Sequence, residues 1–260
     1  MDLRGVMEQV RGYRHAFLMP LLSLDQITVE KVFSYATNLP NCLFFVSSQG
    51  ECERPVVWSG LNNIILTSPS RALSRIEHWN FAVQMAEGLF FDTFSFLFYG
   101  DEIDCQSFNS AVFNESTDLI FNDYFVISGK QCSRKNNLII LNAPRWNFWL
   151  CSVFGVLSYA PLQKIIFKKK TANLIKFNSE SRYTSDQDLI CSILSRKGMK
   201  TDFIKTPFYR LIMDHRGVEK NISFMERISG AACFYRKRKM YAGLFFYVTI
   251  SIVRVLIKRI

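Results

Sequence analysis

The sequence has few of the residues from which metal and disulfide sites are commonly built. It contains only three histidines, His15, His78 and His215, and none stands in a His-x-x-x-His or His-Glu-x-x-His pattern. Its seven cysteines are odd in number and scattered, and no two form a Cys-x-x-Cys pair. These absences argue against a histidine-built metal site, a zinc finger and a disulfide framework, and they favour a reducing cytosol.

Two further absences concern the ends of the chain. The first residues lack the apolar core of a secretory signal peptide, because Arg4, Glu8 and Arg11 interrupt it. Between residues 231 and 260 there are seven lysines or arginines and no acidic residue. This tail carries most of the net charge of +10, so a nucleic-acid-binding role for the whole protein becomes only a third hypothesis.

The tail also has the pattern of a helix that lies on a membrane. Residues 236–239 are all basic, residues 240–257 are mainly apolar with one interruption at Arg254, and Lys258 and Arg259 follow. Eighteen residues is short for a membrane span, which needs about 20 apolar residues. Basic residues at both ends favour a helix in the interface of an anionic membrane; a true span and a helix packed on its own domain are the alternatives.

The remainder of the chain predicts an α/β sandwich. With 260 residues, 49% of them hydrophobic, it can form one sizeable core, and most of its 24 phenylalanines lie in apolar runs typical of a core. Predicted strands and helices alternate, and residues 144–182 are predicted to form a covering loop. The predicted strands are 15–22, 42–47, 63–67, 94–99, 118–127 and 137–141, and the predicted helices are 28–38, 74–87 and a third that begins at 185.

Charged clusters follow some of these elements. The aromatic run 94–99 stops at Gly100-Asp101-Glu102, which places acids at the carboxyl edge of a sheet, although such a turn is also ordinary loop chemistry. Asp186 and Asp188 open the third helix, where acids also stabilise the helix dipole. A basic cluster of Lys164 with residues 168–170 is either a solvated face or a phosphate-steering patch.

Several short motifs occur together in a fixed order along the chain. In that order they are Glu77-His78-Trp79-Asn80, Ala86-Glu87-Gly88, Gly100-Asp101-Glu102, Leu119-Ile120-Phe121-Asn122-Asp123-Tyr124, Leu162-Gln163 and Thr184-Ser185-Asp186. This series resembles family-two glycosyltransferases of the GT-A fold, and the branch it looks most like contains the bacterial enzymes of colanic acid and O-antigen assembly. The resemblance covers roughly residues 40 to 220.

The resemblance implies a fold and a set of site residues. The fold would be a GT-A-like three-layer sandwich with a mixed, mostly parallel sheet in residues 1–230, followed by the basic amphipathic helix in 231–260. Asp101 would meet the divalent metal, Mg²⁺ or Mn²⁺, or the donor diphosphate, and Asp186 would be the general base. The remaining implied residues are Glu51, Glu77, Asn80 and Glu102 on the donor side, and Asp123, Gln163 and Asp188 on the acceptor side or site wall.

The implied activity is that of an inverting, metal-dependent hexosyltransferase in bacterial surface polysaccharide synthesis. It would use a nucleotide-sugar donor and a lipid-linked or oligosaccharide acceptor, and would work on the inner, cytoplasmic face of the cell membrane. The family usually has a nucleotide-binding aspartate after its second strand, whereas residues 46–51 contain only Glu51. A non-catalytic scaffold or binding subunit at the membrane that keeps the same sheet is therefore the alternative.

Overall fold

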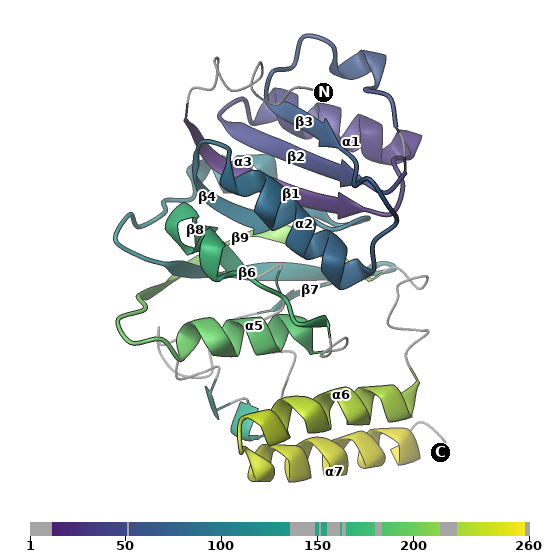
Figure 1. Ribbon diagram of the computed structural model, residues 1–260, viewed down its shortest axis with the longest axis vertical. Helices are drawn as coiled ribbons and strands as arrows, with labels where there is room; N and C mark the ends of the chain where they lie inside the picture. Colours follow the sequence, from purple (N-terminus) through teal and green to yellow (C-terminus); the bar gives the residue numbers. More distant parts are fainter. Residues whose placement is uncertain are drawn as a thin grey trace.

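The fold is built around one mixed β-sheet, which has nine strands in the part of the chain that the structure describes (Figure 1). The computed structural model describes residues 12–50, 52–135, 149–150, 152–154, 162, 165–179, 184–213 and 223–257. The strand order is β3-β2-β1-β4-β8-β6-β9-β5, and β7 extends β6 as a hairpin. The sequence-based prediction of an α/β fold with a mixed, mostly parallel sheet is confirmed.

The first four strands form a parallel half-sheet. Strand β1 lies between β2 and β4, and β3 pairs with β2. Strands β1 and β2 are buried along most of their length on both faces, as expected for parallel strands that are covered by helices. The elements are β1 (Tyr13–Leu21), α1 (Gln26–Asn38), β2 (Cys42–Ser48), η3 (Val56–Trp58), β3 (Ile64–Thr67), α2 (Arg75–Glu87) and β4 (Phe91–Phe96).

The second half of the sheet contains the antiparallel pairings. Strand β8 is antiparallel to both β4 and β6, and β9 runs parallel to β6. The strands are β5 (Glu102–Ile103), β6 (Leu119–Ser128), β7 (Gln131–Lys135), β8 (Ile165–Lys168) and β9 (Thr201–Ile212). The helical segments are α3 (Cys105–Ser110), η6 (Lys169–Leu174), α5 (Ser185–Leu194), α6 (Phe224–Lys237) and α7 (Tyr241–Ile257).

Alternating side chains of the strands build a separate core on each face of the sheet. Ala16 and Leu18 of β1 belong to the core under α2, α5 and α6, whereas Phe17 and Met19 belong to the core under α1 and α3. Trp58 is fully buried in this second core, where its indole N–H donates to the Val29 carbonyl of α1 at 3.0 Å. The two cores fix the sheet between its helices.

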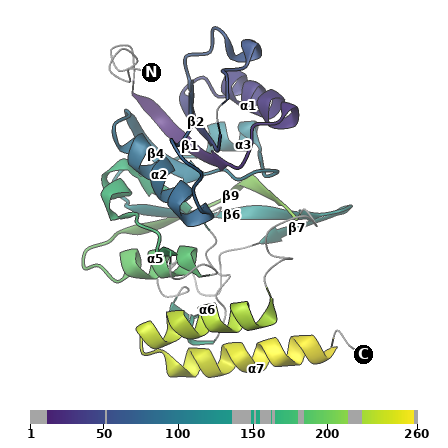
Figure 2. The same ribbon diagram turned by 45° about the vertical axis from the view of Figure 1, so that its right-hand side comes forward.

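Helices α6 and α7 form an antiparallel hairpin at one end of the molecule, with α6 between α5 and α7 in both views (Figure 2). Close packing depends on Gly243 of α7, because an added Cβ would lie 2.4 Å from the Tyr235 ring and 2.5 Å from the Ser152 carbonyl oxygen. Tyr235 of α6 is fully buried in the core that contains α5. The hairpin is therefore packed directly on the sheet domain.

The predicted elements of the first half agree with the structure within a few residues, except that β4 ends at Phe96 and residues 97–99 follow it. Several described elements were not predicted, namely β5, β7, β8, β9, α3, α6 and the short 3-10 helices η3 and η6; of these, β8 and η6 lie inside the predicted loop 144–182. The predicted strand 137–141 lies outside the described residues. The structure describes the third helix as Ser185–Leu194.

Candidate active site

The candidate site lies at the carboxyl edge of the parallel strands. Because β1, β2, β3 and β4 run parallel, the segments that follow them meet at this edge, and helix α2 starts there after β3. Open α/β sheets bind their ligands at this edge. The first residue of α2, Arg75, is close enough to Asp186 in α5 to lower the pKa of its carboxyl group.

Asp186 has the properties of a general base. It is partly exposed to solvent, but most of its carboxyl group is surrounded by protein, and this burial raises its pKa to about 6. The Gln187 backbone N–H, which donates to Oδ1 at 2.9 Å, and the Arg75 charge act in the opposite direction. A carboxylate whose pKa is near the working pH is suited to take a proton from a hydroxyl group.

Arg75 was not identified from the sequence. Its guanidinium lies 5.2 Å from the centre of the Trp79 ring, and Trp79 in turn contacts the rings of Phe98 and Phe177. A signal for it was present, since a cation at the first position of a helix opposes the helix dipole and needs another reason to be there. Arg75 therefore presents a positive charge beside Asp186 on an aromatic wall.

Asp101 lies at this edge but is deeply placed. It is 5% exposed; its Oδ2 accepts from the Tyr209 hydroxyl at 2.6 Å, and its Oδ1 accepts from the Ile212 backbone N–H at 3.2 Å. These contacts tie the segment after β4 to the end of β9. The neighbouring Glu102 forms an ion pair with Lys31 of α1 at 3.2 Å.

A divalent metal needs several oxygen or nitrogen ligands at one point. In the part of the chain that the structure describes, no three His, Cys, Asp or Glu side chains come together in that way. Both Asp101 oxygens already accept hydrogen bonds from Tyr209 and Ile212. As placed, the described residues around Asp101 do not fit a metal site.

Two residues predicted for the donor side make local contacts in α2. Glu77 completes a capping box with Ser74, and hydrogen bonds from Ser74 and Arg71 lower the pKa of Glu77 to about 2. Asn80 forms two hydrogen bonds with the backbone of Phe177, at 3.0 and 2.8 Å. Asn80 therefore holds the segment that carries Phe177 against α2, beside Trp79.

The acids predicted for the acceptor side do not meet at one point. Asp123 of β6 is buried and ion-paired with Arg134 of β7, while Asp188 is buried and paired with Lys237 and Arg238 of the hairpin. Glu51 and Gln163 lie outside the described residues. The structure thus brings Asp186 close to Arg75, and it places Asp123 and Asp188 in separate ion pairs.

Side chains at the end of β2 form hydrogen bonds within the protein. The Gln49 side-chain amide donates to the Leu73 carbonyl and accepts from the Leu73 N–H, both at 2.8 Å. Ser47, which is fully buried, hydrogen-bonds to His78 of α2 at 2.8 Å. These contacts fix the loop that leads into α2 and hence the position of Arg75.

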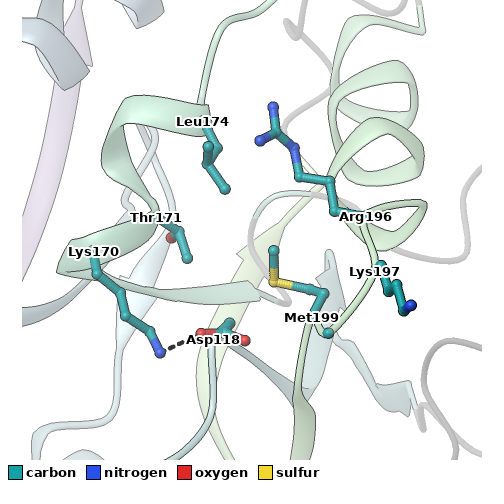
Figure 3. A pocket seen from close by; sticks show the side chains of 8 residues that line it. Asp118, Lys170, Thr171, Leu174, Arg196, Lys197 and Met199 are labelled. Atoms are coloured by element: carbon teal, nitrogen blue, oxygen red, sulfur yellow. Dashed lines mark ion pairs between the residues drawn. The ribbon is translucent and has the colours of Figure 1, made fainter.

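A concave region lies at the opposite, amino edge of the sheet (Figure 3). This pocket of about 470 Å³ has Leu174 and Met199 at its centre, with Arg196 on one side and the Lys170–Asp118 ion pair on the other. Lys169 is used differently, since its ammonium donates to the carbonyls of Ala86 and Glu87 at the end of α2. Two lysines of the basic cluster thus make structural contacts.

The outer surface of α7 is rich in exposed apolar side chains. Tyr241 and Phe245 are 64% and 68% exposed, and Phe246, Ile252 and Val253 are also exposed. Four successive basic residues, 236–239, lie at the end of α6 and in the turn that leads to α7. None of the helices in the described residues has the length and apolar character needed to cross a membrane.

No protein-family model matches the sequence, and no curated protein matches it either. Solved structures do resemble the fold. Staphylococcus aureus TarS in complex with UDP-GlcNAc superposes with a TM-score of 0.59 at 11% identity, over 85% of this chain and 65% of TarS 1–349. Glucosyl-3-phosphoglycerate synthase from Mycobacterium tuberculosis, in complex with Mn²⁺, UDP and glucosyl-3-phosphoglycerate, gives a TM-score of 0.52 at 13% identity, over 86% and 80% of the two chains.

These neighbours are GT-A glycosyltransferases, and the chain shares their fold. It spans 65% of TarS 1–349 and 37% of a longer TarS chain. Identities of 11% and 13% establish similarity of fold only.

Proposed function

We propose that the protein is a glycosyltransferase that moves a sugar from a nucleotide-sugar donor to an acceptor hydroxyl group. The observation that carries the proposal is Asp186, a carboxyl group with a pKa of about 6 beside the cationic Arg75 at the carboxyl edge. The fold is shared with enzymes whose structures contain UDP or UDP-GlcNAc, which supports the same donor class here.

The proposed reaction is a single displacement that inverts the anomeric carbon. Asp186 accepts the proton of the acceptor hydroxyl, whose oxygen forms a bond to the anomeric carbon. The bond from that carbon to the nucleoside diphosphate breaks, and the leaving group departs with the electron pair. Arg75 contributes a positive charge on the side where negative charge develops on the leaving nucleoside diphosphate. No step is assigned to a metal ion.

The proposal is tested by measuring transfer and binding with a panel of UDP-, GDP- and dTDP-sugars. We expect one donor class to bind in calorimetry and to be consumed when an oligosaccharide acceptor is added. The same titration with Mn²⁺ and with EDTA reports whether donor binding requires a metal. If the protein neither bound nor transferred a sugar from any of these donors, the proposal would be contradicted.

The second candidate is a non-catalytic scaffold that keeps the sheet. Its support is the end of β2, where Gln49 is bonded to Leu73 and no described acid is available to a nucleotide. It predicts no donor binding in the same calorimetric panel. Donor binding by the wild-type protein in this panel would therefore favour the enzyme over the scaffold.

We further propose that the acceptor is lipid-linked or an oligosaccharide of the bacterial cell surface, and that the protein works on the inner face of the membrane. The apolar face of α7 and the exposed basic residue Lys239, which lies just before this helix, support this location. Such a face enters the headgroup region, while cations interact with anionic lipids.

Vesicle co-sedimentation tests the location. We expect the protein to bind phosphatidylglycerol-containing vesicles more tightly than phosphatidylcholine vesicles, with binding that weakens as salt rises. Replacing Tyr241 and Phe245 together by glutamine should reduce binding by at least 10-fold, because each side chain contributes about 1 kcal/mol or more when it leaves water. Val56→Gln is the matched control, because Val56 is 87% exposed on a different element. Equal binding by both variants would contradict this location.

A further inference from the structure

The first turn of α5 is held by ion pairs to the α6–α7 hairpin. Asp188 is 4% exposed, and its Oδ2 accepts from the Lys237 ammonium at 3.2 Å while its Oδ1 accepts from Arg238. Arg238 also donates to the Asp188 carbonyl at 2.8 Å and to the Ser192 hydroxyl at 3.1 Å. Asp188 is two residues from Asp186 on the same helical turn, so the hairpin is bonded to the segment that carries the proposed base.

The start of α5 has no side-chain cap of its own. Thr184 occupies the N-cap position, where a hydroxyl would ordinarily accept a hydrogen bond from a backbone N–H within the first turn. Instead, the Thr184 hydroxyl donates to the Gly230 carbonyl of α6 at 3.4 Å. The first turn is therefore fixed from outside, by α6, at two points.

Apolar packing joins the same elements. Ala231, Phe234 and Tyr235 of α6 are fully buried, and they share one core with Leu189 and Ile190 of α5. Figure 2 shows α5, α6 and α7 stacked in that order below the sheet. A change in the hairpin is thus transmitted to α5 by direct contact.

We propose that Asp188, Lys237 and Arg238 are positioning residues, through which the hairpin holds Asp186 at the carboxyl edge. The hairpin then belongs to the catalytic unit and is required for transfer even to a water-soluble acceptor. This inference rests on the proposed function of Asp186. In this inference Asp188 positions helix α5 and does not contact the acceptor.

Charge removal at the ion pair tests this role. Arg238→Gln leaves the Asp188 carboxylate buried with one cation fewer, and Asp188→Asn leaves Arg238 without its anion. With a water-soluble acceptor, we expect each single variant to lower kcat at least 10-fold, to leave the donor KM within about 2-fold, and to displace the acid limb of the pH profile. The double variant, whose two amides can pair without charge, should recover to within about 3-fold of wild type.

Arg236→Gln is the matched control, because it removes the same charge from the same turn of α6, while Arg236 is exposed and forms no ion pair with any described residue. We expect its kcat and pH profile to equal those of wild type. Single variants at Asp188 and Arg238 that keep the wild-type kcat and pH profile would overturn the proposal. Variants that lower the unfolding temperature but keep the wild-type pH profile would also overturn the proposal, because this is the result expected of a purely structural role.

Failure of the proposed function gives a different pattern, since the wild-type protein itself would then transfer nothing. Hydrogen exchange decides the positioning role in that case. Faster exchange of the amides of residues 187–190 in Arg238→Gln, with Arg236→Gln unchanged, supports it. Unchanged exchange in both variants overturns it.

Discussion

Asp186→Asn is expected to lower kcat by roughly 10²- to 10⁴-fold, the usual contribution of a positioned general base. The amide keeps the shape of the side chain but cannot accept the hydroxyl proton. In the wild-type protein, burial raises the pKa of Asp186 to about 6, so kcat/KM should fall tenfold per pH unit below about pH 6 as the carboxylate becomes protonated. The variant should have lost this acid limb.

The measurement is a pH profile of kcat/KM for both proteins, together with their urea unfolding curves. Burial disfavours the charged carboxylate, so its replacement by a neutral amide is not expected to destabilise the fold above pH 6. Asp92→Asn is the control, because Asp92 is exposed at the amino end of β4, far from the carboxyl edge. A variant at Asp186 that retains more than a tenth of wild-type activity would remove the role of base from this residue.

The second large effect concerns the stability of the fold in acid. His15 of β1 is fully buried, and burial, with a smaller contribution from the charge of Arg14, lowers its pKa from 6.5 to about 3. The unfolded chain therefore binds a proton that the folded chain excludes between about pH 6.5 and pH 3. Stability should fall through this window as pH decreases, by about 1.4 kcal/mol per pH unit and about 3 kcal/mol at pH 4.5.

The hydrogen bonds around His15 give the structural reason. The Thr93 hydroxyl donates to the Arg14 carbonyl, so it accepts from Nδ1 of His15 at 2.8 Å. Nε2 then accepts from the Ser95 hydroxyl at 2.9 Å. A second proton on Nε2 would require the Ser95 hydroxyl to turn and accept instead of donate, and it would leave a buried cation without an acid partner.

Urea unfolding between pH 4 and pH 7.5 measures this effect as the slope of the unfolding free energy with pH. His15→Gln should be less stable at pH 7.5 but should have a flatter slope. His78→Gln is the comparison, because burial also lowers the pKa of His78, which is bonded to Ser47, but by less than that of His15. It should therefore flatten the slope less than His15→Gln does. A slope unchanged by His15→Gln would assign the acid sensitivity to other groups.

Local sequence pattern was sufficient to predict the parallel half of the sheet. Strands such as β2 are short apolar runs, and α2 has a capping residue at Ser74 and apolar residues at helical spacing. Strand β9 was missed because its burial is intermediate along much of its length, so it lacks a clear apolar alternation. Helix α6 was missed because its second half, from residue 231, continues without a break in charge character into the basic tail, although Ser223 and Glu226 form a capping box.

The site was less predictable than the fold, since its geometry depends on contacts distant in sequence. Asp186 was a candidate because of its place at a helix start, but its pKa depends on how much protein surrounds it and on Arg75, 111 positions earlier. The same sequence signal also selected Asp188, which pairs with Lys237 and Arg238 instead. Sequence spacing cannot separate these two acids, because only the tertiary fold decides which one faces α6.

The position of β8 has a consequence for synthesis of the chain on the ribosome. Strands β1 to β4 are complete by residue 96, but β4 has an unpaired edge until β8, residues 165–168, has been made. The exposed edge of β4, in which three of the six residues are phenylalanines, can pair with other chains. The nascent first half therefore passes through a period of aggregation risk that ends only when the distant strand β8 arrives to cover it.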